Sequence, residues 1–255
     1  PDEKQLLSVK HHMIRFISVH DYYSSSMFER DVLSLLPDLF TRKNIAILTG
    51  GSGMYINAVC QGIDDIPDVD PVVRDKYIRK YREEGIESLR MELKRRDPLH
   101  YEKVDLKNPK RIIRALEICD STGLPYSSFL TNKKRTRDFG IIKIGLQRPR
   151  EELNERINSR VDKMIEAGLE EEARGLYQYR HLNSLKTVGY REFFDHFEGK
   201  ITREEAIRLI KRNSRRFAKR QMTWWAKDSE ISWFYAEEKE KIIEHINRQM
   251  ALIMR

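Results

Sequence analysis

The stretch IAILT-GGSG-MYINAVC, residues 45–60, decides the expected fold. Residues 45–49 are almost entirely apolar, which is typical of a buried strand, and the glycines at 50, 51 and 53 predict a tight loop before a helix. A strand, a tight loop and a helix in this order form one βα unit of an α/β fold, whose ligands usually bind at the carboxyl ends of the strands. We therefore expect a functional site beside this loop.

Further strands and helices are expected on both sides of this unit. Loose alternation favours a strand over residues 14–19, and apolar runs favour strands over 141–146 and 231–235. Helical spacing extends over 23–40, and over 150–177 with a break at Gly168. Thr202, with Glu205 three residues later, predicts the capped start of a long helix towards Lys227.

The composition changes after Gly62, which indicates a second domain. Residues 64–71 form an acidic connector that contains proline, and residues 72–122 predict helices rich in charge. Asn108 followed by Pro109 marks the start of the third of these helices, and Gly123 marks its end. The sequence thus predicts an α/β core of residues 1–64 and 139–255, interrupted by a mainly helical insertion of residues 65–138.

The overall composition favours a globular protein. Of 255 residues, 40% are hydrophobic and 35% are charged, and no run approaches the roughly 20 apolar residues that a membrane helix needs. The N-terminus also lacks the features of a signal peptide. We expect a soluble, cytoplasmic protein without a membrane partner. Cys60 and Cys119 lie in apolar surroundings and are expected to be core thiols, and the histidines form no zinc pattern.

The net charge of +8 is concentrated in one stretch. Residues 208–227 contain eight basic residues and no acidic residue. Like charges three or four residues apart on a helix repel, so an anionic partner is expected, although a solvated basic face stays an alternative. Phe217, Trp224 and Trp225 lie within this stretch, and a second basic cluster lies at 110–114. This mixture favours a nucleic acid or a diphosphate as the partner.

Seven motifs, taken in order, resemble those of the tRNA dimethylallyltransferase family. They are HHMI at 11–14 with Tyr23, Ser24 and Phe28; GGSGMYINA at 50–58; DPVVR at 70–74; NPKRIIRALEI at 108–118, followed by STGLPYSSF; the pattern RxxLxxRIxxRVDxM at 150–164; TVGYREF at 187–193; and RRFAKRQMTWW at 215–225. Each motif alone is weak, whereas seven in the family's order are specific. The resemblance covers essentially the whole chain.

The resemblance implies a fold and a reaction. Members of the family transfer a dimethylallyl group from dimethylallyl diphosphate to N6 of adenosine 37, beside the anticodon of a tRNA. Their fold is a P-loop NTPase-like parallel-sheet core with a helical insertion that grips the anticodon stem-loop. The resemblance therefore implies tRNA and dimethylallyl diphosphate as partners, Mg²⁺ as cofactor and a monomer as the state of the protein.

The resemblance also implies site residues by position. The diphosphate is expected at Arg215, although Ser214 replaces the family's threonine before it. Ser52 is expected beside the flipped adenosine, with Gly50, Gly51 and Gly53 as the loop near the substrate. Contacts to tRNA are expected from Arg74, Lys110, Arg111, Ile112, Ile113, Arg114, Lys186, Thr187, Val188, Gly189, Tyr190, Arg191, Lys219, Arg220, Gln221, Met222, Thr223, Trp224, Trp225 and Ala226.

The sequence departs from the family at its start. The family's G-x-x-x-x-G-K-[ST] loop and its Asp-Ser-x-Gln segment, whose aspartate is the general base, are not found among the 255 residues. The general base and the main phosphate-binding loop thus have no counterpart in the 255 residues. This polypeptide is expected to bind RNA but to show little or no transferase activity.

Alternatives stay open on the residues alone. A P-loop-type nucleotide kinase would need a Walker loop, and a non-catalytic tRNA-binding fragment would need only the basic surfaces. The glycine loop at 50–53 could be no more than a tight turn that lets a helix pack. Residues 187–190 could likewise be a structural turn, and at least one of Trp224 and Trp225 is expected to anchor the core.

Overall fold

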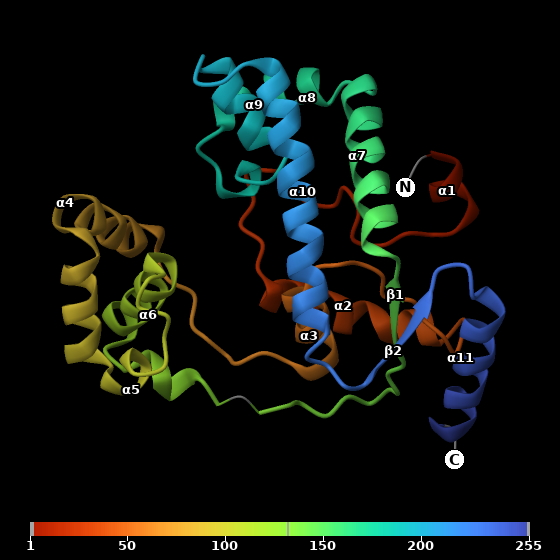
Figure 1. Ribbon diagram of the computed structural model, residues 1–255. Coiled ribbons are helices and arrows are strands. Elements are labelled where there is room, and N and C mark those ends of the chain that lie inside the picture. Colours follow the sequence, from red (N-terminus) through yellow and green to blue (C-terminus); the bar gives the residue numbers. More distant parts are fainter. Residues whose placement is uncertain (1–2, 132, 254–255) are drawn as a thin grey trace. The chain divides into compact units, whose positions relative to one another are not determined.

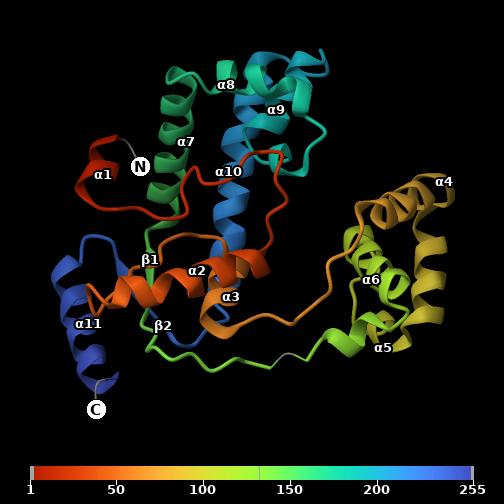
Figure 2. The same cartoon turned by 180° about the vertical axis from the view of Figure 1, so that it is seen from behind.

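The computed structural model describes residues 3–131 and 133–253, which form two compact units. Unit 1 contains the residues up to Ser24, Thr49–Gly53 and the residues from Phe139 onward, and unit 2 contains Ser25–Leu48 and Met54–Asp138. Figure 1 shows the elements of both units, and Figure 2 shows them from behind. Unit 2 is larger than the predicted insertion, because residues 25–48 and 54–64 belong to it. The predicted division at residue 64 stays a prediction.

Unit 1 carries both strands of the described chain. Its elements are α1 (Glu3–Ser8), β1 (Lys143–Gln147), α7 (Arg150–Glu166), α8 (Leu169–Leu176), the 3-10 turns η2 (Tyr177–Tyr179) and η3 (Asn183–Leu185), α9 (Tyr190–Phe197), α10 (Arg203–Trp225), β2 (Ile231–Tyr235) and α11 (Lys239–Ile253). The two strands lie side by side in Figures 1 and 2, and they pair in parallel, with Lys143 opposite Ile231 and Gln147 opposite Tyr235. This pairing confirms the expected α/β class and the strands predicted near 141–146 and at 231–235.

Helix α10 organises the core of unit 1. It packs against α7 and α9, and the buried side chains between these helices include Val161, Phe193 and Ile210. The Thr202 hydroxyl caps α10 by accepting a hydrogen bond from the backbone N–H of Glu205 at 3.2 Å, as its spacing predicts. The break predicted at Gly168 separates α7 from α8. The long basic helix is therefore anchored along its first half and projects its second half beyond this core.

The regular secondary structure of unit 2 is helical in the described residues. Its elements are α2 (Ser25–Phe40), most of α3 (Gly53–Gln61), α4 (Pro71–Arg96), α5 (Pro98–Tyr101), α6 (Pro109–Thr122) and the 3-10 turn η1 (Tyr126–Phe129). Its core lies between α4, which is kinked at Gly85, and α6, and contains Tyr77, Leu93 and Leu116. Asn108 caps α6 and Gly123 ends it, as predicted. Local cap chemistry was sufficient to place this helix.

Two strand predictions are wrong. Residues 45–49 form no strand, and Ile47 in this stretch is 87% exposed. A strand needs a neighbouring backbone for its hydrogen bonds, and the sheet of the described residues consists of β1 and β2 alone. Residues 14–19 form no strand either, because Met13 and Arg15 have φ values of 58° and 53°, which are incompatible with an extended chain.

The described part of the chain contains no helix that is long and apolar enough to cross a membrane.

Candidate functional site

The glycine loop lies directly against helix α10. A Cβ atom on Gly51 would overlap the side-chain amide of Gln221, and a Cβ atom on Gly53 would overlap the indole of Trp224. The absence of a side chain at these two positions is what allows the approach. Ser52, between them, is exposed. The loop predicted near the substrate and the aromatic residue predicted to contact RNA are therefore neighbours within unit 1.

The basic residues of α10 fall into two sets. Arg208 pairs with Glu205 at 2.6 Å and Lys211 pairs with Asp162 of α7 at 2.5 Å, so the protein itself neutralises these two charges. The expectation that the whole stretch needs an external anion is wrong for them. In the second half of α10 and just after it, no carboxylate among the described residues forms an ion pair with Arg216, Lys219, Arg220 or Lys227. The uncompensated charge therefore lies at the end of α10 that approaches the glycine loop.

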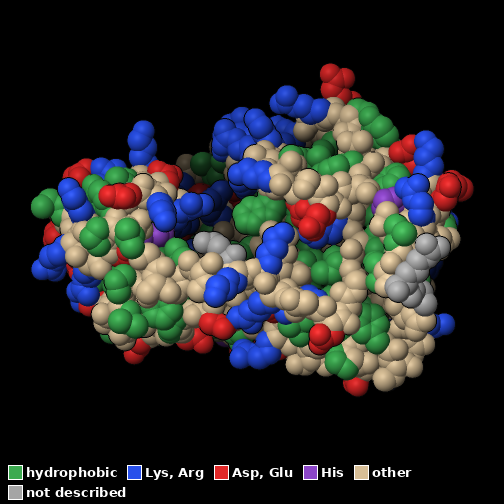
Figure 3. All heavy atoms as spheres, turned by 90° about the horizontal axis from the view of Figure 1, so that it is seen from below, with side chains coloured by type: hydrophobic (Ala, Val, Ile, Leu, Met, Phe, Trp, Pro, Cys, Tyr) green, Lys and Arg blue, Asp and Glu red, His purple; other side chains and the backbone are tan. Residues whose placement is uncertain are grey.

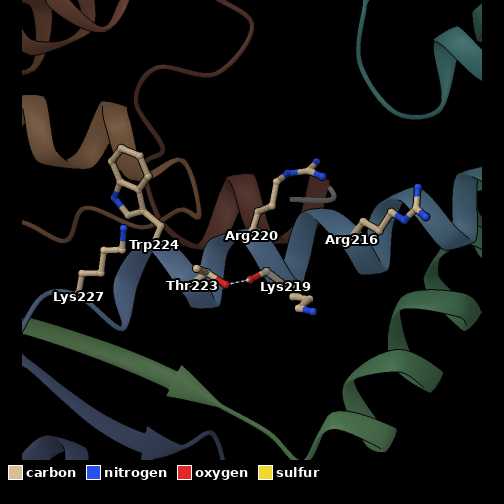
Figure 4. Close-up of a pocket in the computed structure, with 6 residues that line it drawn as sticks. All are labelled: Arg216, Lys219, Arg220, Thr223, Trp224 and Lys227. Carbon is tan, nitrogen blue, oxygen red and sulfur yellow. Dashed lines mark hydrogen bonds between the residues drawn. The ribbon is translucent and has the colours of Figure 1, made fainter. Parts of the chain in front are cut away.

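These unpaired basic residues line a hollow on the surface of α10. Arg216, Arg220, Trp224 and Lys227 follow one another at intervals of three or four residues and so share one face of the helix. Together with Lys219 and Thr223 they line a hollow of about 440 Å³, which Figure 4 shows. Trp224 is 47% exposed. Cationic side chains around an exposed indole suit a ligand with phosphates and an aromatic base.

The polar contacts inside the hollow leave the charged groups available. The Thr223 hydroxyl donates a hydrogen bond to the carbonyl oxygen of Lys219 at 2.9 Å, drawn as a dashed line in Figure 4. The Arg220 guanidinium lies 5.6 Å from the ring centroid of Phe217, which is itself 48% exposed. Figure 3 shows a face of the molecule on which Lys and Arg side chains gather in several places with hydrophobic side chains exposed among them.

Arg215 is oriented by a neutral partner. Its Nη1 donates a hydrogen bond to Oδ1 of Asn158 in α7 at 2.5 Å, and its side chain is partly buried. An amide oxygen fixes the direction of the guanidinium without neutralising its charge. Arg215 therefore keeps a full positive charge for an anionic group, in the place where the resemblance implies a diphosphate site.

A buried glutamate attaches the loop of residues 186–191 to α10. Glu192 is 2% exposed, and its carboxylate accepts hydrogen bonds from the backbone N–H of Gly189 at 2.8 Å and from Nδ2 of Asn213 in α10 at 2.7 Å. It also accepts one from Nη2 of Arg191 at 3.0 Å. The φ value of Gly189 is 108°, which a residue with a side chain rarely adopts. The loop is thus fixed beside α10.

Some residues of this loop pack against the protein, and others are exposed. Gly189 is buried, and Val188 and Tyr190 are partly buried and pack against the core, so the predicted RNA contact of these three residues stays a prediction. The hydroxyl of Tyr190 donates a hydrogen bond to Glu172 at 2.6 Å, and burial together with this bond raises the pKa of Tyr190 to about 12. The surface of the loop is formed by Lys186, Thr187 and Arg191, which are exposed.

In unit 2, two predicted contact residues meet on one carboxylate. Glu117 of α6 is 1% exposed, and it pairs with Nε of Arg74 in α4 at 3.1 Å and with Nη1 of Arg114 at 2.6 Å. The side chains of Arg74 and Arg114 are 49% and 33% exposed. The exposed Lys110 and Arg111 lie three or four residues before Arg114, on the same side of α6. These four cations form the basic face of α6.

The two isoleucines of the same segment do not belong to that face. Ile112 is 0% exposed and Ile113 is 7% exposed, and both pack in the core of unit 2. An amphipathic helix turns these two side chains inward while its charged neighbours face outward, and the predicted contact of Ile112 and Ile113 with tRNA stays a prediction.

The structure shows no metal-binding cluster in its described parts. No group of three or more His, Cys, Asp or Glu side chains there is arranged to hold a metal ion. Neither Cys60 nor Cys119 forms a disulfide among the described residues, and Cys119 is buried, which raises the pKa of its thiol. The expectation of core thiols is confirmed for Cys119, while Cys60 is only partly buried.

Sequence reasoning missed the residues that hold the predicted ones in place. Glu117, Glu192 and Asn158 each bond to a predicted contact residue, and Asn213 bonds to Glu192 in turn. Only two of these contacts have a signal in the sequence: Glu117 follows Arg114 by three residues, and Glu192 directly follows Arg191. The contacts of Asn158 and Asn213 join segments that are far apart in the chain, so their spacing gives no signal.

Comparison with known proteins gives a consistent family. A model of the IPP transferase family matches residues 1–228. A protein of Parabacteroides distasonis, named tRNA dimethylallyltransferase 2, is 53% identical over 250 residues, which cover 98% of this chain and 84% of the relative.

Solved structures agree with this match. The tRNA isopentenylpyrophosphate transferase of Bacillus halodurans is 33% identical and superposes with a TM-score of 0.65 over 100% of this chain and 82% of that one. A eukaryotic dimethylallyltransferase, whose structures follow its action on tRNA, superposes with a TM-score of 0.76 at 22% identity, covering 98% of this chain and 68% of that one. The second likeness concerns the fold alone.

Proposed function

Since this chain belongs to the IPP transferase family, we propose that it is a tRNA dimethylallyltransferase, an enzyme that transfers a prenyl group to tRNA. The proposed donor is dimethylallyl diphosphate and the proposed acceptor is N6 of adenosine 37. The observation that carries the proposal is the face of α10 with its unpaired cations and exposed Trp224, seated against the glycine loop. The cytoplasm is the proposed location, since the substrate is a tRNA.

The proposed reaction forms one bond and breaks one. The N6 nitrogen attacks the allylic carbon of the donor, a C–N bond forms, and the C–O bond to the diphosphate breaks with its electron pair. The amine loses a proton, a step that suits a positioned carboxylate. We assign none of the described residues to that step. Their proposed part is to bind the RNA, to orient it and to stabilise the departing diphosphate.

Arg215 is the proposed contact to the diphosphate. Negative charge grows on the leaving group as the C–O bond breaks, so a fixed guanidinium stabilises the transition state more than the ground state. The hydrogen bond from Arg215 to Asn158 supports this role, because it fixes the group without cancelling its charge. Mg²⁺ belongs to the proposal only through the family resemblance. The described residues offer it no cluster of three or more ligands.

The RNA is proposed to contact two basic surfaces. Lys219, Arg220 and Trp224 in the hollow of α10 suit phosphates and an unstacked base, and Ser52 is exposed in the loop beside Trp224. The basic face of α6, formed by Arg74, Lys110, Arg111 and Arg114, is the proposed contact of unit 2 to the stem-loop. Neither surface needs to read the whole sequence of the RNA, because phosphate contacts position it.

A binding experiment with two RNA hairpins tests the proposal. One is an anticodon stem-loop with adenosine at positions 36 and 37, and the other differs only in the base at 37. We expect tighter binding of the first, and for both an affinity that falls steeply as salt is raised. Equal affinity for the two hairpins, or an affinity that does not change with salt, would contradict the assignment to tRNA.

A further inference from the structure

The basic face of α6 contains one charge of the opposite sign, and it is buried. Along this helix the positions of Ile112, Ile113, Leu116 and Ile118 are filled by buried apolar side chains, whereas the equally buried residue 117 is a glutamate. Burying a carboxylate is unfavourable unless it is paired and hydrogen-bonded. Glu117 is paired with two guanidiniums: its Oε1 accepts a hydrogen bond from Nη1 of Arg114, whereas its buried Oε2 faces Nε of Arg74 in an ion pair without a hydrogen bond.

The two guanidiniums come from different helices. Arg74 lies in the first turn of α4 and Arg114 lies in α6, and one carboxylate oxygen faces each of them, at 3.1 Å and 2.6 Å. Both arginine side chains remain partly exposed, at 49% and 33%. Arginine carries five N–H donors, so a guanidinium that faces Glu117 with one of its nitrogens keeps other donors for an external acceptor. The two guanidiniums and the carboxylate together therefore carry one net positive charge, and the guanidiniums remain partly exposed.

We infer that Glu117 is a positioning residue for RNA binding, which holds Arg74 and Arg114 in the directions from which they contact RNA phosphates. The inference rests on the proposed function, because it takes the basic face of α6 as an RNA contact. A free arginine loses rotamer freedom when it binds, and a side chain that is already held loses less. Glu117 thus strengthens the binding of an anion although its own charge is negative.

The negative charge makes the test sharp, because two explanations predict opposite signs. If Glu117 acts only as a charge near the RNA, Glu117→Gln removes a repulsion and strengthens binding. If Glu117 positions the arginines, the same change weakens binding, because a glutamine amide turns an N–H group towards one of the guanidiniums. We expect Glu117→Gln to weaken binding of the anticodon stem-loop by about 10-fold, the scale of releasing one or two long side chains.

A second readout separates positioning from general damage. Loss of one or two phosphate contacts should make the plot of log affinity against log salt shallower by about 0.7 to 0.9 per contact. In a double-mutant cycle, Glu117→Gln should cost less in an Arg74→Ala background than in the wild type, because the carboxylate acts through that arginine. Glu117→Asp, which keeps the charge, should recover part of the affinity.

Glu92→Gln is the matched control. Glu92 is a partly buried carboxylate of α4 that also holds two cations, Lys80 at 2.5 Å and Arg96 at 3.0 Å, but neither belongs to the basic face of α6. We expect it to change thermal stability without changing the RNA affinity of the folded protein or the salt slope. Where Glu117→Gln fails to fold, Arg74→Ala alone, which leaves Arg114 on Glu117, must still weaken binding.

The outcomes distinguish this inference from the proposed function. If the wild type does not bind the stem-loop, the proposed function fails. If the wild type binds and Lys110→Ala weakens binding, but Glu117→Gln binds as well as the wild type or better, only the role of Glu117 is overturned. An equal cost of Glu117→Gln with and without Arg74 would also overturn it.

Discussion

The backbone of Gly53 lies against the indole of Trp224, so closely that a single added carbon on the glycine would overlap the ring. This relationship joins the glycine loop of residues 50–53 to the end of α10, the helix that carries the unpaired cations. The glycines at 51 and 53 therefore do more than permit the turn. They let the loop and an exposed aromatic ring form one surface.

Gly53→Ala is expected to displace Trp224 and to weaken binding of the stem-loop. Stacking of a base on an aromatic ring contributes about 1–3 kcal/mol, so loss of the ring's position should cost up to that amount. Tryptophan fluorescence and RNA titration measure the two effects together. Gly175→Ala in α8 is the control, because a Cβ atom there meets nothing within 4 Å. Wild-type binding by Gly53→Ala would show that the position of Trp224 is unimportant.

In the protein expressed as its gene encodes it, Arg215→Ala is expected to lower kcat far more than RNA affinity. If the guanidinium stabilises the departing diphosphate, its loss should cost about 100-fold in rate, as the loss of a donor at a developing charge typically does. Asn158→Ala should shift the same parameter by less, because Arg215 remains but is no longer oriented. Steady-state kinetics with RNA and donor varied separately provide the measurement. Arg208→Ala, whose charge is paired with Glu205, serves as the control.

Replacing Lys219 and Arg220 by alanine is expected to weaken RNA binding and to flatten its salt dependence. Each phosphate contact that is lost should reduce the slope of log affinity against log salt by about 0.7 to 0.9. Titrations at several salt concentrations give this slope. Arg203→Ala removes a basic residue of the same helix that pairs with Glu170, and it should leave the slope unchanged. If the variant without Lys219 and Arg220 had the same slope as Arg203→Ala, the hollow of α10 would not be part of the RNA interface.

Unit 2 is expected to lose stability in acid, because the ionised carboxylate of Glu92 then no longer stabilises the fold. Burial alone would raise the pKa of Glu92, but hydrogen bonds from Lys80 and Tyr77 outweigh it and lower the pKa below its usual value near 4.5. A carboxylate with a lowered pKa stabilises the fold above its unfolded pKa, and this contribution is lost as the pH falls through the folded pKa. Glu92→Gln should therefore cost about 1–3 kcal/mol at pH 7.

The difference between wild type and Glu92→Gln should shrink as the pH falls through the lowered pKa of Glu92, where the wild-type carboxylate takes up its proton. Urea unfolding of both proteins at neutral and acidic pH measures it. A difference that stays constant over this range would mean that the charge of Glu92 contributes nothing and that only its shape matters.

Sequence alone predicted the parts of this fold that depend on local chemistry. Asn108, Pro109 and Gly123 bound α6, and Thr202 starts α10, because caps and turns act over three or four residues. Residues 45–49 were wrongly predicted as a strand, since alternation and apolarity do not reveal whether a partner strand is present. The α/β class was nevertheless predicted correctly, because two other segments, β1 and β2, form a parallel pair.

The site shows the same limit. The basic stretch at 208–227 was visible from the sequence, but the pairing of Lys211 with Asp162 was not, because it joins two helices. Burial of Ile112 and Ile113, in contrast, follows from helical spacing alone. Residues such as Glu117 and Asn158, which orient cations from another helix, become visible only when the helices are packed.

Transfer of the prenyl group itself is the most direct test of the central claim. The protein, expressed as its gene encodes it, is incubated with labelled dimethylallyl diphosphate and an anticodon stem-loop, and the RNA is digested to nucleosides. The account predicts label on N6 of the adenosine at position 37, and none on a hairpin with another base there. Binding of the stem-loop without any label in the adenosine would contradict it.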